Sequence, residues 1–435
     1  MPTDPDSVNP RDPVFVSYRH SDGKPIAAEL TWLLRAAGIP VWRDVDDLPP
    51  GDTRERLQQA IDDGISGAVI VVTPEIAASP VVREVEAPRL LDLHRSRPAF
   101  ALGIVNDVHR PDGELDYSAP DRLLGLERSE LKGVDQRETT RPGLVEMAKQ
   151  MLWHRIASLR PEILSESRAI RISIQTRNTP QVYDRTDADL DVRLRPSTHE
   201  KLPSRAGLLD LMETAPFLPD AVTRSAAHGL HIEGGAHLSV AVALGAIIPS
   251  TRIGPVTVTD GRGDDWRSTT EAQIPDPERL RVLGRFAGHR PLPEDRRADV
   301  AAYVDLQTPP SNAAFEKFLR DHDAILTDWV HIAAVHDGLL DVGDAGNLAA
   351  EAAARLRELS MSNGNARVHL MFRGPFAVAT LIGRLTNTLR ITSYEYDESQ
   401  SLSAPFVGPR YEPVLEIRAS TPTGAIQEVV VPDHA

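Results

Sequence analysis

The chain has 435 residues and carries 48 Lys+Arg against 63 Asp+Glu, which gives a formal net charge of −15 at pH 7. Its length exceeds what one ordinary hydrophobic core organises, so we expect two or three domains, and the negative charge excludes a protein that coats duplex nucleic acid or an anionic membrane with its whole surface. The absence of cysteine excludes disulfides, cysteine-ligated zinc, iron–sulfur clusters and thiol nucleophiles.

Neither the N-terminal segment nor the apolar runs indicate a membrane or secreted protein. Residues 1–13 are acidic and proline-rich without an apolar core, so they do not form a secretory signal. The longest near-continuous apolar run, Leu238 to Ile248, is well short of the roughly 20 residues that a membrane-spanning helix needs. We therefore expect a cytoplasmic protein.

Strands and helices are predicted to alternate between residues 14 and 105. Buried strands are expected where apolar and β-branched residues run together, and helices where apolar residues repeat every three or four positions. The strands expected on this basis are Val14–Tyr18, Ile39–Trp42, Ser66–Thr73 and Ala99–Val105, and the helices are Pro25–Ala37, Thr53–Asp63 and a segment that Ser79 caps and that runs through Leu93. Strands separated by helices imply βαβ units and a parallel sheet.

A change of composition marks the end of this first region. Residues 106–141 are polar and irregular, and a closing helix is expected from Leu144 to Leu159. Pro161 then begins a natural boundary. We place the first domain at residues 12–158 and the second at residues 165–430.

The second region contains a weak internal repeat. A small, apolar helix that ends in Gly245 is followed by an alternating strand at 254–260, and a similar helix that ends in Gly383 is followed by a strand at 389–396. An expected strand also precedes each helix. Two strand–glycine–helix–strand units predict two similar α/β halves packed side by side, with chance similarity of Ala/Gly-rich helices as the alternative.

Three motifs in the first domain occur in an order and spacing that are specific when taken together. They are Ser17-Tyr-Arg-His-x-Asp22, Gly38-Ile-x-Val-Trp-x-Asp44 and Leu48-x-Pro-Gly51. With these motifs, residues 12–158 resemble a TIR domain, and the resemblance implies a flavodoxin-like parallel sheet. TIR domains are either protein–protein adaptors or NAD glycohydrolases, so both functions stay open.

The resemblance implies that an enzymatic TIR domain uses one glutamate on the helix after the strand at 68–72. The family usually has a tryptophan shortly before this glutamate, whereas residues 80–82 here are Pro-Val-Val. The register is therefore open between Glu84 and Glu86, which lie two positions apart and cannot share a helix face. Glu84 is the expected catalytic residue because its spacing from Ser79 matches the family best.

A single carboxylate suits cleavage of the bond between nicotinamide and ribose. The sugar develops oxocarbenium character, which a carboxylate stabilises, and nicotinamide leaves without a general acid because it is already cationic in NAD+. Redox use of NAD+ and hydrolysis of nucleoside triphosphates are disfavoured, since the chain has neither a GxGxxG nor a GxxxxGK run. NAD+ is expected as the substrate, and neither a cofactor nor a metal ion is expected to be required.

Further NAD+ contacts are expected at the carboxyl ends of the first two strands, where parallel sheets bind ligands. Tyr18 and Arg19 end the first strand, and Trp42 and Asp44 end the second. Core packing of Trp42 and capping of the strand end by Tyr18 and Arg19 are the structural alternatives. The resemblance also implies that the loop beginning at Asp44 closes over the NAD+ of a neighbouring copy, with Leu48 as its apolar tip.

The second domain has its own motifs, His231-x-x-Gly-Gly-x-His237-Leu238-Ser239 in the first half of the repeat and Arg373-Gly-Pro375 and Tyr394-x-Tyr396 in the second. With these, residues 165–430 resemble a SAVED domain, the sensor module fused to effectors in bacterial CBASS antiphage systems. The resemblance implies two fused Rossmann-like halves, which also explains the repeat. It further implies a cyclic oligonucleotide bound in a groove shared by both halves.

Glycine-rich turns enter a helix in both halves, at Gly234-Gly235 and at Gly374. Such turns allow backbone N–H groups and the positive end of a helix to approach phosphate. Nearby histidines can hydrogen-bond a phosphate or a base edge and tyrosines can stack on a base, although packing and capping are alternatives for both. The residues expected to contact the oligonucleotide are His231, His237, Leu238, Ser239, Arg373, Pro375 and Tyr394, with Tyr396 as the alternative to Tyr394.

Taken together, these features predict an antiphage sensor–effector. A cyclic oligonucleotide, in the first instance a cyclic trinucleotide such as cyclic tri-adenylate, binds the second domain, drives head-to-tail oligomers or filaments and activates NAD+ hydrolysis by the first domain, which depletes cellular NAD+. Two alternatives stay open. The first domain can be a non-catalytic assembly module, or the second can be an inactive sensor on a constitutive hydrolase.

Overall fold

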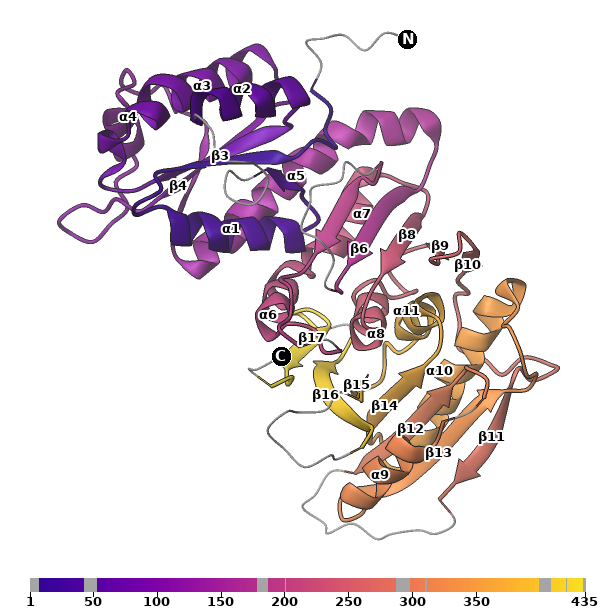
Figure 1. The fold of residues 1–435 in the computed structure, drawn as a ribbon. Helices are drawn as coiled ribbons and strands as arrows, with labels where there is room; N and C mark the ends of the chain where they lie inside the picture. The colour runs from indigo at the N-terminus through magenta and orange to yellow at the C-terminus, as the bar shows by residue number, and fades with distance from the viewer. Residues whose placement is uncertain are drawn as a thin grey trace.

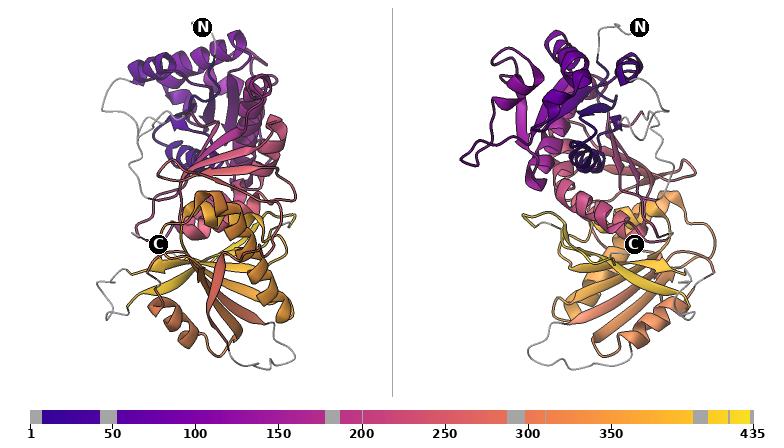
Figure 2. Two further views of the ribbon diagram at one scale, coloured as in Figure 1. Left: turned by 90° about the vertical axis from the view of Figure 1, so that its right-hand side faces the viewer. Right: turned by 60° about the vertical axis from the view of Figure 1, so that its left-hand side comes forward.

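Three β-sheets follow one another along the elongated molecule (Figures 1 and 2). In this computed structural model, the first sheet is formed by the N-terminal strands and the other two by the rest of the chain. The structure describes residues 8–42, 53–177, 187–199, 201–286, 298–309, 311–398, 408–419 and 421–432.

The first sheet is parallel throughout, with the strand order β2-β1-β3-β4-β5. Its strands are β1 (Val14–Tyr18), β2 (Val41–Trp42), β3 (Gly67–Val72), β4 (Ala101–Asn106) and β5 (Asp135–Glu138). The helices around it are α1 (Lys24–Ala36), α2 (Thr53–Asp63), α3 (Ala87–Ser96), α4 (Ala119–Leu124) and α5 (Arg141–Glu166). The flavodoxin-like parallel sheet expected from the sequence is thereby confirmed.

Two elements lie in the stretch that the sequence indicates as irregular. The edge strand β5 reads Asp-Gln-Arg-Glu and is half exposed, so no apolar run marks it. The short helix α4 lies in the same polar stretch. Both form because neighbouring elements support them, which a local pattern does not record.

The helix expected between Ser79 and Leu93 is divided into two parts. A 3₁₀ turn, η1 (Ile76–Ala78), is followed by a π-helical turn, η2 (Val82–Glu86), and only then by α3. In the π turn the Ala87 N–H donates to the Val82 carbonyl, five residues back. Pro88 has no N–H to give to the Glu84 carbonyl, so one α-helical hydrogen bond is missing in any case and the wider turn costs little.

The long helix α5 joins the first sheet to the rest of the chain. It continues to Glu166 with Pro161 inside it, so the boundary expected at Pro161 lies within a continuous helix. The buried Arg155 of this helix donates to the carbonyls of Asp12 and Asp189, at 3.0 and 2.8 Å, on either side of it. The first sheet and the second therefore share one hydrophobic core along α5.

The second sheet has the order β10-β9-β8-β6-β7 and the third the order β11-β13-β12-β14-β15-β16-β17. The strands of the second sheet are β6 (Ile170–Gln175), β7 (Leu190–Arg193), β8 (Leu230–Gly235), β9 (Val256–Thr259) and β10 (Asp265–Arg267). Those of the third are β11 (Leu280–Arg285), β12 (Asp299–Asp305), β13 (Leu326–Ala334), β14 (Arg367–Arg373), β15 (Ile391–Asp397), β16 (Arg410–Ile417) and β17 (Ile426–Val429). The helices of this region are α6 (Arg205–Thr214), α7 (Phe217–Ser225), α8 (Leu238–Ile247), α9 (Ala313–Asp321), α10 (Ala345–Ser362) and α11 (Phe376–Arg384), with a 3₁₀ turn η3 (Val342–Asp344).

Helices α8 and α11, the two copies of the repeat, pack directly against each other between the second and third sheets (Figure 1). They cross at Gly245 and Gly383, where a Cβ on either glycine would collide with backbone of the other helix. Only glycine permits this close approach. The structure confirms the repeat and the two α/β halves packed side by side.

No helix within the described ranges is long and apolar enough to cross a membrane. The most apolar helix, α8, has only 10 residues.

Candidate functional site

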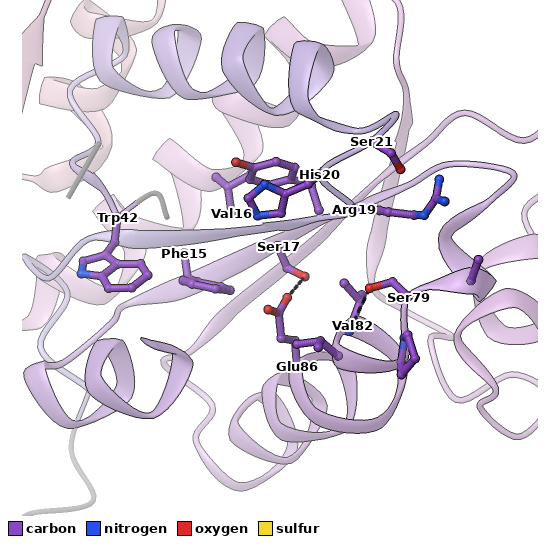
Figure 3. Close-up of a pocket in the computed structure, with 14 residues that line it drawn as sticks. Phe15, Val16, Ser17, Arg19, His20, Ser21, Trp42, Ser79, Val82 and Glu86 are labelled. Atoms are coloured by element: carbon purple, nitrogen blue, oxygen red, sulfur yellow. Dashed lines mark hydrogen bonds between the residues drawn. The ribbon is translucent and has the colours of Figure 1, made fainter. Parts of the chain in front are cut away.

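A cavity of about 350 Å³ opens at the carboxyl edge of the first sheet, between β1, β2 and the segment after β3. This is the edge at which parallel sheets bind ligands. The cavity is lined by Phe15, Val16, Ser17, Tyr18, Arg19, His20, Ser21, Trp42, Ala78, Ser79, Pro80, Val81, Val82 and Glu86 (Figure 3).

Glu86 supplies the carboxylate of this cavity. Its side chain points from the π turn toward β1, and it is only 4% exposed (Figure 3). The Ser17 hydroxyl donates to Glu86 Oε2 at 2.5 Å. A buried carboxylate held by a hydroxyl at the wall of a cavity can meet a ligand without first shedding a full hydration shell.

Glu84, the expected catalytic residue, is on the exposed side of the same turn and does not line the cavity. Within the π turn, Glu86 is buried toward the sheet and Glu84 is exposed to solvent. The geometry therefore favours Glu86, the alternative that the sequence left open.

Aromatic rings also contribute to the wall of this cavity. Phe15 and Trp42 contact each other with ring centroids 5.4 Å apart, and both are more than nine-tenths buried. Tyr18 packs on His20 at a centroid distance of 5.1 Å. Both expected ligand residues Tyr18 and Trp42 line the cavity, so a flat, aromatic ligand ring has surfaces on which to pack.

Arg19 lies at the rim. Its Nη1 contacts Glu75 Oε2 at 2.9 Å and Asp22 Oδ1 at 3.1 Å. Burial opposes ionisation of Asp22, but hydrogen bonds from Thr73 and Arg19 outweigh it and lower the pKa of this carboxyl. The remaining expected NAD+ contacts, Asp44 and Leu48, lie outside the described residues.

In the second domain, the glycine-led start of α8 is already occupied by a side chain of the chain itself. The backbone N–H and the hydroxyl of Ser239 donate to Glu395 Oε1, at 2.6 and 2.7 Å. Glu395 comes from β15 of the other half. Burial raises its pKa to about 7 against the effect of the Ser239 hydrogen bonds. A carboxylate thus takes the position at which the sequence predicts a phosphate.

His237 caps the same helix start and is closed off from solvent. Its backbone N–H donates to Thr176 Oγ1 at 2.8 Å, and its Nδ1 lies 2.9 Å from the same oxygen. Burial, with a smaller effect of the Arg177 charge, lowers the pKa of His237 to about 3. The ring is therefore neutral near pH 7 and holds the turn in place.

The structure separates His231 from this helix start. His231 lies near the amino end of β8, where its Nε2 is 2.6 Å from Thr259 Oγ1. Leu238 is half-buried in the first turn of α8, next to Ser239. Of the four candidates in this motif, only His237, Leu238 and Ser239 lie together.

In the third sheet, Arg373 ends β14 and Pro375 caps α11. Arg373 Nη1 lies 3.1 Å from Asp305 Oδ1 and also donates to the Pro309 carbonyl at 2.8 Å. Its side chain is 28% exposed and remains accessible at the carboxyl edge.

Tyr394 is not available for stacking on a base. It is 5% exposed, its hydroxyl lies 2.8 Å from His369 Nδ1, and its ring packs edge-on against Phe318. Tyr396, two residues further along β15, is 37% exposed and packs edge-on against Tyr411. Of these two tyrosines, Tyr396 is therefore the one whose ring is exposed.

Basic groups from both halves lie near the end of β15, where the charge of Arg177 acts on Glu395 and those of Lys201 and Arg373 act on Tyr396. Lys201 Nζ lies 3.7 Å from Glu398, which follows β15, and Arg177 follows β6. Burial and Glu398 raise the pKa of Tyr396, and the charges of Arg373 and Lys201 oppose this effect. Arg177 and Lys201 have no distinguishing motif in the sequence, and only their electrostatic interactions with residues of β15 identify them.

Two regions of the chain match family models. Residues 14–122 match the TIR domain, and residues 213–417 match SAVED, described as the SMODS-associated and fused to various effectors sensor domain. A search of curated proteins finds no match.

Solved structures that are similar to this chain include SAVED/CARF-domain containing receptors. The Acinetobacter baumannii Cap4 receptor with the cyclic trinucleotide 2′3′3′-cAAA is 13% identical, with a TM-score of 0.44 over 91% of this chain and 97% of that chain. The same receptor with 3′3′3′-cAAA is 12% identical, with the same TM-score and coverage. The Moraxella osloensis Cap4 receptor is 12% identical, with a TM-score of 0.39 over 91% of this chain and 98% of that chain.

Proposed function

We propose that this chain, which joins a TIR domain to a SAVED sensor domain, is an NAD+ glycohydrolase that a cyclic oligonucleotide activates. The observation that supports this most directly is the buried Glu86 carboxylate, which lines an aromatic-walled cavity at the ligand-binding edge of the TIR sheet. An adaptor domain needs no buried carboxylate at such a place.

The proposed reaction uses this carboxylate alone. The bond between ribose C1′ and the nicotinamide nitrogen breaks, and its electron pair neutralises the pyridinium. Glu86 stabilises the oxocarbenium ion that remains, and water adds to C1′ and loses one proton, so that NAD+ and water give ADP-ribose, nicotinamide and H+. Transfer to a hydroxyl of the same molecule instead of water would give a cyclic product.

The cavity wall fits the substrate in two respects. Phe15 and Trp42 offer a flat apolar surface for the nicotinamide ring near the carboxylate. Arg19 at the rim supplies a cation for the pyrophosphate, once it exchanges its contacts with Glu75 and Asp22.

The activator is proposed to bind the carboxyl edges of the two SAVED halves. Arg177, Lys201 and Arg373 supply cations there for phosphates, and Tyr396 supplies an exposed ring for a base. The description of the SAVED family as a sensor fused to effectors supports an activating role. We propose a cyclic trinucleotide as the activator.

Activation is proposed to occur by assembly of copies. The TIR domain is fixed to the first SAVED half, since Glu29 of α1 pairs with Arg195 at 2.7 Å and Arg141 of α5 pairs with Asp210 at 2.6 Å. The Asp191 N–H also donates to the Gly38 carbonyl at 2.8 Å. A TIR domain held in this way follows its sensor, so a messenger that lines up sensors head to tail lines up TIR domains too.

NAD+ turnover with a panel of cyclic di-, tri- and tetranucleotides tests the proposal. We expect turnover with a cyclic trinucleotide only, and a rate that rises more steeply than linearly with protein concentration as particles grow by light scattering. In a cell this activity would deplete cytoplasmic NAD+ and so act in antiphage defence. If a messenger binds but NAD+ is not cleaved, the TIR domain is a non-catalytic assembly module. If NAD+ is cleaved without any messenger, the chain is a constitutive hydrolase.

A further inference from the structure

We infer that Ser17 is a positioning residue that orients the Glu86 carboxylate for reaction. This inference rests on the proposed NAD+ cleavage and adds a residue to it. The Ser17 hydroxyl is not the reacting group in this inference, because it donates a hydrogen bond to Glu86.

The position of Ser17 in β1 explains why its hydroxyl faces the π turn. Successive residues of a strand point to opposite faces of a sheet. Val14, Val16 and Tyr18 belong to the core on one face, and Phe15 belongs to the core on the other. Ser17 therefore shares the face of Phe15, on which η2 and α3 lie.

Ser17 is 1% exposed and is the one residue of the strand Val-Phe-Val-Ser-Tyr with an aliphatic hydroxyl. A hydroxyl buried in this way needs a partner, and a carboxylate buried in this way needs a donor. The two residues are 69 positions apart in the chain and satisfy each other at 2.5 Å (Figure 3).

The location of this bond distinguishes it from ordinary core packing. Both Ser17 and Glu86 line the cavity, so their hydrogen bond forms part of its wall. Glu86 has three rotatable side-chain bonds, and a donor fixed on a strand selects one orientation of the carboxylate plane. A hydrogen bond to the charged form also favours the ionised carboxylate, which is the form that stabilises an oxocarbenium ion.

Three variants of the full chain, assayed with the activating messenger, test this role. Ser17→Ala removes the donor, and Ser17→Thr retains a hydroxyl at the same place. Ser66→Ala is the matched control, since it also removes a buried hydroxyl of the TIR domain, one that donates to the Asp12 carbonyl at 2.7 Å away from the cavity. Messenger binding and the unfolding temperature are measured for all three.

We expect Ser17→Ala to lower kcat roughly 10- to 100-fold while KM for NAD+ changes less than about 3-fold, because misplacement of a reacting group mainly affects the transition state. The acid limb of its pH–rate profile should move up by about one pH unit, since the charged carboxylate loses a donor. Ser17→Thr should recover most of kcat, and Ser66→Ala should match the wild type.

Wild-type kcat and an unshifted acid limb in a folded Ser17→Ala variant would overturn the inference while leaving the proposed function intact. An equal loss of kcat in Ser66→Ala, or a loss in Ser17→Ala that follows only its unfolding temperature, would also overturn it, since hydroxyl removal would then act through stability. An inactive wild type that binds messenger would instead overturn the proposed function, and this inference with it.

Discussion

Two buried glutamates, one in each domain, accept a hydrogen bond from a serine hydroxyl but stand in different surroundings. Glu86 in the TIR domain is held by Ser17 and lines a cavity of about 350 Å³. Glu395 in the sensor is held by the hydroxyl and the backbone N–H of Ser239 at the start of α8. The same side-chain pair therefore forms part of a cavity wall in one domain and closes a helix start in the other.

This difference shows that a helix N-terminus does not by itself identify the site of an anionic ligand. The N-terminus of α8 follows two glycines at the end of β8, a pattern that favours an anion at the backbone N–H groups of a helix start. It also lies next to a strand of the other half, which supplies the Glu395 carboxyl group as an internal hydrogen-bond acceptor. We therefore propose that the cations and the exposed ring at the strand ends, and not this helix start, bind the ligand of the second domain.

The largest expected effect concerns stability near Glu395. Burial raises the pKa of this group from 4.5 to about 7, so the folded chain holds the proton more tightly than the unfolded chain. The stabilisation is fully present below about pH 4.5 and is lost as pH rises through about 7. The glutamine of Glu395→Gln does not titrate in this pH range, and its carbonyl oxygen can still accept the hydrogen bonds from Ser239.

Denaturant unfolding of both proteins between pH 5 and 8 checks this. Glu395→Gln and the wild type should be nearly equal at pH 5, and the variant should be the more stable one at pH 8 by up to about 3 kcal/mol. His237 stays neutral across this window because its pKa is about 3. Glu233→Gln, a half-buried glutamate of β8, serves as the control. A difference between the two proteins that does not change with pH would contradict this account of Glu395.

The second effect concerns Arg373. Removing a charged donor to a phosphate costs roughly 1.5–2.5 kcal/mol, so Arg373→Gln should weaken binding of the messenger about 10- to 50-fold. Calorimetry measures this, with the exposed Arg320→Gln on α9 as the control. If Arg373→Gln binds as tightly as that control, the messenger is not held at this strand end.

The third and smallest effect concerns the aromatic wall of the TIR cavity. Trp42→Phe keeps an apolar ring but reduces the surface near Phe15. We expect KM for NAD+ to rise about 5-fold with kcat nearly unchanged, because the ring contributes binding that ground state and transition state share. Trp153→Phe, on α5, removes a comparable ring from a pair with Phe217 and is the control. If Trp42→Phe and Trp153→Phe have equal KM values for NAD+, the nicotinamide ring does not pack on Trp42.

Much of the fold follows from local patterns. Apolar runs predict β1, β3 and β4, and the helices that end near Gly245 and Gly383 predict the two halves of the sensor. Strand β5 escapes such a prediction because its four residues are polar and its stability comes from pairing with β4.

The sites follow from the sequence only in part, because they depend on distant contacts. The choice between Glu84 and Glu86 depends on which of the two faces β1, and this contact joins Glu86 to Ser17, 69 positions away in the chain. The contact between Ser239 and Glu395 joins residues 156 positions apart, and the burial of Tyr394 depends on α9 covering its face. The sequence does predict that Tyr18, Arg19 and Trp42 line the cavity, because they stand at the carboxyl ends of neighbouring strands.

The central proposal is that the Glu86 carboxylate, which lines the cavity of the TIR domain, cleaves NAD+ under control of the messenger. The most direct measurement is NAD+ turnover, at saturating messenger, by the matched pair Glu86→Gln and Glu84→Gln, with messenger affinity measured alongside. We predict that Glu86→Gln loses turnover by at least about 1000-fold and binds messenger like the wild type, while Glu84→Gln keeps turnover within about 2-fold. An active Glu86→Gln beside an inactive Glu84→Gln would contradict the account.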